Sequence, residues 1–232
     1  MTDKPATILS LDCATTGCSV CVWQGGVVLS AQSQEMARGQ AEILMPMIQE
    51  VLRAAHVLPD DLDAIGVTRG PGAFTGLRIA LASARGLALS LDIPCVGVTT
   101  LEVLALAVPE DERKNRSILA CVESKRADIY VQLFDATVQP LSEPQALGGA
   151  ALVDFAQDLG TLVLVGDASA RAVEMLADTN VETVLSAAPH LPDAALIARL
   201  AAIRLGDAAS PQPLYLRPPD AKLPKNAGRS RA

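Results

Sequence analysis

Aromatic residues are rare in this 232-residue sequence, at 3%, although half of the residues are hydrophobic. The core must therefore be built from aliphatic side chains rather than from rings. Histidine is rarer still, with two residues, His56 and His190. They form no H-x-x-x-H or H-E-x-x-H pair that would place two imidazoles on one helical face. A G-x-S-x-G nucleophile elbow is also missing. We therefore expect no metal site and no catalytic group in this chain.

Long hydrophobic runs are missing too. Residues 1–5 are polar, and the apolar run at residues 7–11 is too short for a signal peptide or a membrane span. We expect a cytoplasmic protein without membrane contact. The five cysteines lack the dense spacing of a disulfide scaffold, so reduced thiols are expected. Cys18 and Cys21 form a C-x-x-C, but residues three apart in a strand point to opposite faces, which disfavours a redox or zinc site.

Charge is unevenly distributed along the chain. The formal net charge of −7 disfavours nonspecific binding to nucleic acid by the chain as a whole. Residues 217–232, however, contain five basic residues, one acidic residue and three prolines. Two interpretations stay open for this segment: a flexible solubilising tail, or an arm that contacts RNA or a partner.

The order of periodic segments in the first half indicates an α/β protein. The expected strands are residues 7–13, 19–24, 27–32, 63–68 and 94–98, and the expected helices are residues 41–55 and 76–90. Gly25-Gly26 between the second and third strands is typical of a tight hairpin. Three strands followed by helix, strand, helix and strand is the order of a ribonuclease-H-like lobe, the repeated unit of the actin and sugar-kinase class.

The pattern partly recurs after a charged linker at residues 108–115. The expected strands there are residues 117–123, 128–134 and 161–165, and the expected helices are residues 169–177 and 193–205. We therefore predict a two-lobed actin-like, ribonuclease-H-like (ASKHA) fold with a mixed five-stranded sheet in the N-terminal lobe and a reduced C-terminal lobe. The predicted divisions are residues 1–108, residues 109–216 and a basic, flexible tail at residues 217–232.

The densest local motif is R-G-P-G-A-F-T-G-L-R-I at residues 69–79, between an expected strand and an expected helix. Its glycines permit a tight turn, and the start of a helix offers free N–H groups to an anion. The motif lacks the Gly-Lys-Ser/Thr of a Walker A loop, and Gly70, Gly72 and Gly76 do not have G-x-G-x-x-G spacing. Its chemistry alone favours a purely structural turn, with an anion site as the alternative.

Several motifs, in order and over nearly the full length, resemble the TsaB (YeaZ) family. Residues 69–79 resemble the family's G-R-G-P-G-S-F-T-G-x-R-I-G signature. Further segments are similar to the family's I-D-T-S-T, H-S-E-x-L-L-P-x-I, G-V-S-T-L, G-D-G and P-x-Y-L-R motifs, at residues 9–15, 40–48, 97–101, 165–168 and 213–217. The chain departs from the family's residues at Gln40, Glu123 and Ala168.

This resemblance implies a non-catalytic subunit that pairs with TsaD, the catalytic subunit, and supports threonylcarbamoyl transfer to adenosine 37 of ANN-decoding tRNAs. It also implies TsaE, an ATPase, as a partner, a homodimer when TsaD is absent, and contact with tRNA through the complex. No tightly bound cofactor is implied, and ATP or ADP at the partner interface is the nucleotide to consider. The alternative function is an autonomous ATP-dependent kinase of the same fold, with Asp12 and Asp167 around Mg-ATP.

Candidate phosphate-facing residues lie at two turns. The first turn contains Asp12, at the end of the first expected strand, followed by Thr15 and Thr16, where actin-class kinases place their first phosphate loop. The second turn contains Gly166 and Asp167. The alternative is that Asp12 and its threonines satisfy backbone groups of their own turn.

Candidate interface residues lie on two helices that have few charges. Within residues 76–90 the charged residues are Arg78 and Arg85, so the helix needs cover on nearly all sides, from its own core or from another chain. The family resemblance favours another chain. The predicted interface residues are Leu44, Met47, Ile48, Val51, Leu77, Ala80, Leu81 and Ala84, and the predicted motif turn consists of Gly70, Pro71, Gly72, Phe74, Thr75 and Gly76.

Overall fold

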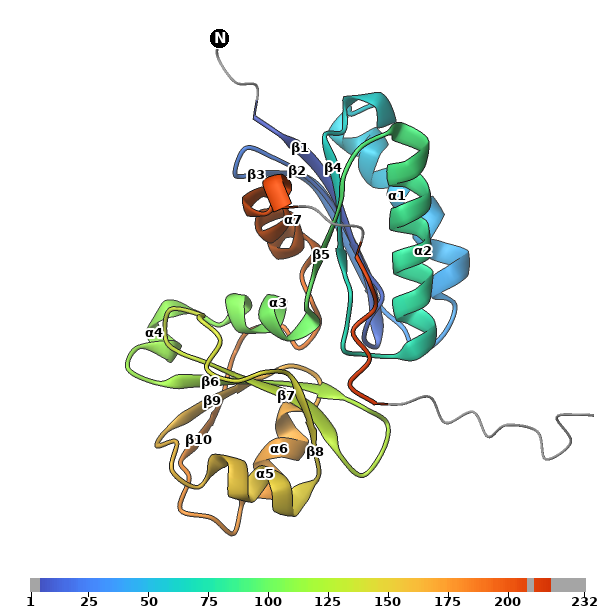
Figure 1. Ribbon diagram of the computed structural model, residues 1–232. Helices are drawn as coiled ribbons and strands as arrows, with labels where there is room; N and C mark the ends of the chain where they lie inside the picture. Colours follow the sequence, from blue (N-terminus) through green and yellow to red (C-terminus); the bar gives the residue numbers. More distant parts are fainter. Residues whose placement is uncertain (1–4, 208–210, 218–232) are drawn as a thin grey trace, which may run out of the picture.

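The first half of the chain forms a mixed five-stranded sheet (Figure 1). The computed structural model describes residues 5–207 and 211–217. The strands are β1 (Thr7–Asp12), β2 (Gly17–Gln24), β3 (Val27–Glu35), β4 (Ala64–Thr68) and β5 (Cys95–Val98), in the order β3-β2-β1-β4-β5. The first three strands pair antiparallel, whereas β1, β4 and β5 pair parallel.

The second sheet repeats this arrangement. Its strands are β6 (Ser117–Glu123), β7 (Ile129–Phe134), β8 (Gln145–Leu147), β9 (Leu162–Val165) and β10 (Thr183–Leu185). Taken from β8, the order β8-β7-β6-β9-β10 matches that of the first sheet, with the same antiparallel and parallel pairs. The two equivalent sheets confirm the predicted two-lobed actin-like, ribonuclease-H-like class.

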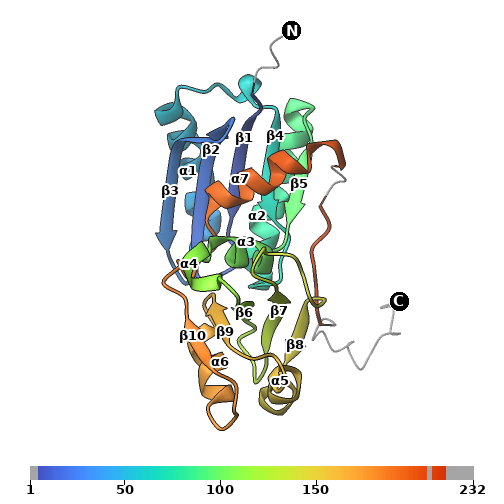
Figure 2. The ribbon, with the colours of Figure 1, turned by 90° about the vertical axis from the view of Figure 1, so that its left-hand side faces the viewer.

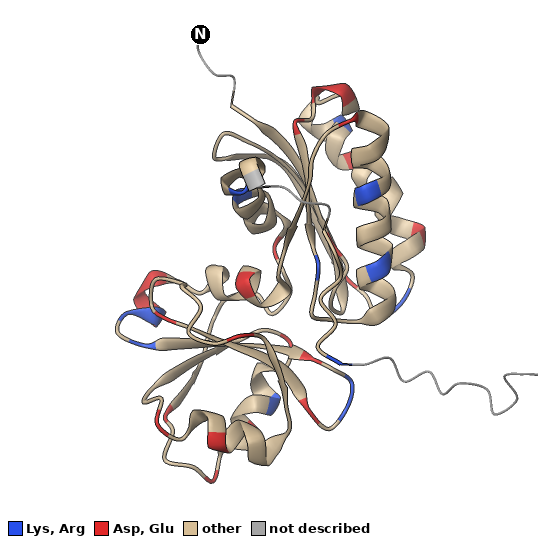
Figure 3. Cartoon of the chain, viewed as in Figure 1, with Lys and Arg blue, Asp and Glu red and all other residues tan. Residues whose placement is uncertain are grey.

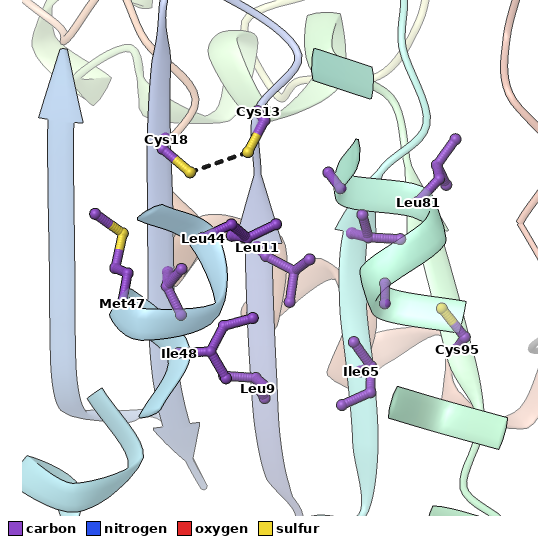
Figure 4. Close-up of a cluster of buried hydrophobic side chains, with 14 of the residues drawn as sticks. Leu9, Leu11, Cys13, Cys18, Leu44, Met47, Ile48, Ile65, Leu81 and Cys95 are labelled. Atoms are coloured by element: carbon purple, nitrogen blue, oxygen red, sulfur yellow. Dashed lines mark hydrogen bonds between the residues drawn. The ribbon is translucent and has the colours of Figure 1, made fainter. Parts of the chain in front are cut away.

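Helices cover both faces of the first sheet. The helices α1 (Gln40–Ala55) and α2 (Phe74–Leu91) lie on one face, and α7 (Ala194–Ile203) lies on the other (Figure 2). Side chains alternate along β1, so that Leu9 and Leu11 pack with α1 and α2 (Figure 4), whereas Ile8 packs with α7. Because both faces are covered, all six residues of β1 are buried.

The second sheet is covered in the same way. The remaining helices are α3 (Thr100–Ala107), α4 (Glu110–Arg113), α5 (Gly149–Ala156) and α6 (Ser169–Leu176), with 3₁₀ turns at Pro59–Asp61 and Leu205–Asp207. Leu104 of α3 packs against Ile118 on one face, and Leu152 of α5 packs against Leu119 on the other. The helix α7 belongs by sequence to the predicted C-terminal lobe, residues 109–216, but it packs on the first sheet. The division of the chain into lobes after residue 108 therefore stays a prediction.

Several sequence expectations can be compared with these elements. The segment expected to be a linker at residues 108–115 contains the one-turn helix α4. The helices α3 and α5 and the strands β8 and β10 were not predicted. All five cysteines are free and buried. Cys18 belongs to the core beneath α1, whereas Cys21 lies near Asp193 on the opposite face of β2, as its position in a strand predicts. Apart from Arg217, the predicted basic tail lies outside the described residues.

Candidate functional site in the cleft between the sheets

The glycines of the motif turn let two backbone segments touch. Ala73 N donates a hydrogen bond to Ala14 O at 2.6 Å. A Cβ at Gly72 would overlap Ala14 O, and a Cβ at Gly76 would overlap Cys13 O. Because these positions are filled by the backbone that follows β1, the two glycines do not cradle a ligand. The geometry therefore favours the structural interpretation of the motif over an anion site at the glycines.

The C-terminal strap, residues 211–217, ties the motif turn to the second lobe. Leu214 N donates to Arg69 O at 2.7 Å, and Gly70, with a φ of 104°, leaves room for Leu214 O. At its far end the strap places Arg217 in an ion pair with Asp128, a buried residue at the start of β7. The strap thus contacts both lobes.

An arginine contacts two aromatic side chains where the strap crosses α2. The guanidinium carbon of Arg78 lies 3.5 Å from the ring centroid of Phe74 and 5.8 Å from that of Tyr215. Its Nε donates to Tyr215 Oη at 2.9 Å. Stacking and the hydrogen bond together fix the orientation of the guanidinium group.

A cleft of about 930 Å³ opens between the two lobes at this point. Its walls come from the turn after β1, the N-terminal ends of α1 and α2, the hairpin between β6 and β7, and the strap. Its basic and aromatic lining residues are Arg38, Arg78, Lys125, Arg126, Arg217, Phe74, Tyr130 and Tyr215. A volume of this size is in the range of small-molecule sites, about 300–1,000 Å³.

The predicted phosphate-facing residues divide into two groups. Thr15 and Thr16 line the cleft, whereas Asp12, Gly166 and Asp167 do not. Thr15 Oγ1 is buried and has no hydrogen-bond partner in the part of the chain that the structure describes. A Cβ at Gly166 would overlap Cys121 O, so this turn too is closely packed against backbone.

Both aspartates accept hydrogen bonds from the protein, Asp12 from its own turn and from the end of β4, and Asp167 from the end of β6. Asp12 Oδ1 accepts from Ala14 N at 3.0 Å and from Thr68 Oγ1, and Asp167 Oδ1 accepts from Glu123 N at 2.9 Å. Burial raises the pKa of Asp12 to about 6, with a smaller contribution from the charge of Asp167. Burial likewise raises the pKa of Asp167, against the hydrogen bond from Glu123 N. These contacts favour the turn-stabilising role that was the alternative to nucleotide contact.

The eight predicted interface residues do not lie on the surface. Leu44, Met47, Ile48, Val51, Leu77, Ala80, Leu81 and Ala84 are 0–7% exposed and belong to the core between the helices and the first sheet. The interface prediction was therefore wrong for these side chains, because each helix turns its largest apolar stripe toward its own sheet. The outer face of α1 and α2 carries other residues, among them Met45, Phe74, Ala82 and Leu89, with Leu89 84% exposed.

The histidines lie away from the cleft. His56 is exposed and ends α1, and His190 Nε2 lies 3.2 Å from Glu35 Oε1 at the surface. Within residues 5–207 and 211–217, no group of three or more His, Cys, Asp or Glu side chains is placed to hold a metal ion. No described helix is long and apolar enough to cross a membrane.

The sequence pattern did not single out most of the cleft's basic and aromatic residues as site residues. Lys125 and Arg126 lie in a short hairpin tip, and Tyr215 is 137 residues from its hydrogen-bond partner Arg78. The available signals were the motif at residues 69–79, which contains Phe74 and Arg78, and the P-x-Y-L-R motif at residues 213–217, which contains Tyr215 and Arg217.

Comparison with known proteins relates the whole arrangement to a family. The sequence model described as "TsaD: tRNA N6-adenosine threonylcarbamoyltransferase" matches residues 23–193. The tRNA threonylcarbamoyladenosine biosynthesis protein TsaB of Escherichia coli is 35% identical over 123 residues, which are 53% of this chain and 52% of that protein. The chain thus spans about half the length of this curated relative. An uncharacterized protein of Mycobacterium tuberculosis is 32% identical over 94% of both chains.

Solved structures extend the similarity to the complete fold. YeaZ from Pseudomonas aeruginosa aligns with a TM-score of 0.75 and 26% identity, covering 91% of this chain and 100% of that one. An activator of 2-hydroxyisocaproyl-CoA dehydratase from Clostridium difficile, with bound ADPNP, aligns with a TM-score of 0.52 and 11% identity over 88% of this chain and 96% of that one. At that identity, the second match concerns the fold alone.

Proposed function

Since the chain belongs to the TsaB (YeaZ) family, we propose that it is a non-catalytic subunit of the machinery that makes threonylcarbamoyladenosine on tRNA. In this proposal it pairs with TsaD and supports threonylcarbamoyl transfer to adenosine 37 of ANN-decoding tRNAs. The observation that carries the proposal is the 35% identity to E. coli TsaB. TsaE as a further partner, a homodimer in the absence of TsaD, and ATP or ADP at the partner interface belong to the same proposal.

The outer face of α1 and α2 is the surface proposed for pairing. Met45, Phe74 and Leu89 are exposed large hydrophobic side chains on this face, at 40%, 49% and 84%. Ala82 and Gly86 lie between Phe74 and Leu89 on α2, and a Cβ at Gly86 would meet nothing within 4 Å. Arg78 and Arg85 are also exposed on α2, so the face combines apolar and small residues with two cations. Such a face suits close contact with another helix pair.

Ala82→Glu should therefore weaken pairing with TsaD by at least about tenfold, which is about 1.4 kcal/mol. The longer, charged side chain would have to be desolvated and accommodated at the centre of the interface. Association of the two purified proteins, measured by analytical ultracentrifugation, checks this expectation. Because Ala82 is exposed, the variant should unfold at the same temperature as the unmodified chain.

Ala80→Glu is the matched variant on the inner face of the same helix. Ala80 is fully buried, so its replacement should unfold the chain rather than affect pairing selectively. If folded Ala82→Glu and a second outer-face variant, Met45→Glu, both associate with TsaD as tightly as the unmodified chain, the proposed surface is wrong.

The alternative, an ATP-dependent kinase of the same fold, makes a different prediction. It requires Asp12 and Asp167 to face bound Mg-ATP, yet neither lines the cleft and both accept backbone hydrogen bonds. Isothermal titration of the isolated chain with Mg-ATP, together with an ATP hydrolysis assay, separates the two functions. Tight binding with turnover by the chain alone would favour the kinase.

A further inference from the structure

We propose that the cleft between the two sheets binds a single-stranded stretch of RNA, with bases stacked on exposed rings and phosphates held by basic side chains. The choice of tRNA as the natural source of this RNA rests on the proposed function. The inference that the cleft binds single-stranded RNA does not depend on the proposed function, because it is argued from the residues that line the cleft.

Aromatic side chains are concentrated in this one cleft. The chain contains six aromatic residues, and three of them, Phe74, Tyr130 and Tyr215, line it. Phe74 and Tyr215 are 49% and 44% exposed, with ring centroids 5.6 Å apart. An exposed ring beside a basic groove is the platform on which unpaired bases stack, at about 1–3 kcal/mol per base.

Basic side chains are concentrated there as well. Five basic residues line the cleft, against two acidic ones, although the chain carries a net charge of −7. The basic residues are Arg38, Arg78, Lys125, Arg126 and Arg217, and the acidic residues are Glu42 and Glu123. Glu123 is paired with Arg171 at 3.0 Å, which reduces its repulsion of an anion, and Arg217 is paired with Asp128, which reduces its attraction in the same way. The local charge therefore suits a phosphate-bearing ligand.

The positions of the basic residues favour a chain of phosphates over a single one. Arg38 precedes α1, whereas Lys125 and Arg126 lie at the hairpin tip of the second lobe, so the charges border the cleft from both sides. Figure 3 shows basic positions on α2, on this hairpin and at the end of the strap.

Arg78 is pre-organised to contact a phosphate. Its guanidinium group contacts the rings of Phe74 and Tyr215, and its Nε already donates a hydrogen bond to Tyr215 Oη. Its two Nη groups donate to no acceptor among the residues that the structure describes. A fixed guanidinium with unused donors binds phosphate at a smaller entropic cost than a mobile one. An acidic peptide would use these cations too, but it would leave the rings without a stacking partner.

The test is the binding of a fluorescently labelled single-stranded RNA to the full-length chain without partner proteins, followed by anisotropy at about 50 and 200 mM salt. Tyr215→Leu should weaken binding at least about fivefold, because it removes one stacking platform from a half-exposed site. Lys125→Ala should make the negative slope of log affinity against log salt shallower by about 0.7, the share of one phosphate contact. Arg199→Ala, an exposed cation on α7 outside the cleft, should change neither quantity.

Several outcomes would overturn the proposal. The chain should bind single-stranded RNA more tightly than the same sequence as a duplex, and equal affinity would exclude base stacking. Displacement of the RNA by ADP at micromolar concentration would assign the cleft to a mononucleotide, and displacement by a poly-glutamate peptide would assign it to an acidic protein. The pairing test uses Ala82→Glu and TsaD, so its failure and the failure of RNA binding are separate results.

Discussion

Gly76→Ala should lower the free energy of unfolding by about 3 kcal/mol, the upper part of the range for overpacking. Gly76 lies in the first turn of α2, where an added Cβ would overlap Cys13 O. The obstacle is backbone rather than the end of a flexible side chain, so relief requires that α2 move away from the β1–β2 turn. That movement would disturb the packing of Leu77 and Ala80 against the sheet.

Gly86→Ala is the matched control on the same helix. Gly86 is exposed, has no positive φ, and has no atom within 4 Å of the ideal Cβ position. Alanine should therefore stabilise α2 by about 0.5–1 kcal/mol, because it restricts the unfolded chain and favours helix. Urea denaturation of both variants, followed by circular dichroism, checks the pair. A similar effect of the two substitutions would mean that the close approach at Gly76 does not constrain the fold.

The first sheet was predictable from local pattern because each of its elements carries one. The Gly25-Gly26 turn lies between β2 and β3, and the apolar spacing of residues 41–55 matches α1 to within one residue. In the second lobe, β8 and β10 are three residues each, too short to show alternation. Helix α5 begins at Gly149, directly after Gly148, and has one charged residue in eight, so its short apolar run did not distinguish helix from strand.

The site was less predictable because its contacts connect distant parts of the chain. Hydrophobic periodicity predicted that Leu44 and Leu77 lie on apolar helix faces, but it cannot tell whether the chain's own sheet or a partner covers such a face. The strap contacts α2 through the pair Tyr215 and Arg78, which no local pattern joins. The cleft's basic and aromatic lining therefore emerged only when the strap, the hairpin and α2 were brought together in space.

Near pH 7.5, Asp12→Asn should raise the free energy of unfolding by about 2 kcal/mol more than it does near pH 4.5. The full shift is worth about 1.36 kcal/mol per pKa unit, and part of it is already present at pH 4.5. The native pKa of Asp12 is about 6, above its ordinary value of 3.8, mainly because the carboxyl is buried. The folded chain therefore binds the proton more tightly than the unfolded chain does. The contribution of Asp12 to stability is therefore greatest below about pH 3.8 and falls as the pH rises through about 6, and asparagine removes this loss.

Comparing two pH values removes contributions that do not depend on pH. Asparagine can still accept from Ala14 N through Oδ1, and any cost of its buried amide is the same at both values. Asp135→Asn is the control of opposite sign, because hydrogen bonds from Gln139 N and Thr137 lower the pKa of this exposed carboxyl. The stabilisation by a carboxyl with a lowered pKa is lost only as the pH falls below about 3.8, so Asp135→Asn should reduce stability by nearly the same amount at pH 7.5 and at pH 4.5. Equal effects of Asp12→Asn at both values would mean that its native pKa is not raised.

The same variant tests whether this carboxyl takes part in chemistry. Asp12 does not line the cleft, and its oxygen Oδ1 holds the turn that carries Thr15 and Thr16. In a reconstituted complex with TsaD, Asp12→Asn should therefore reduce threonylcarbamoyl transfer by less than about tenfold, through small shifts of that turn. A direct acid–base group typically contributes about 10²–10⁴-fold. A loss near the upper end of that range, with assembly intact and the fold stabilised as above, would make Asp12 a catalytic residue and contradict the proposed non-catalytic role.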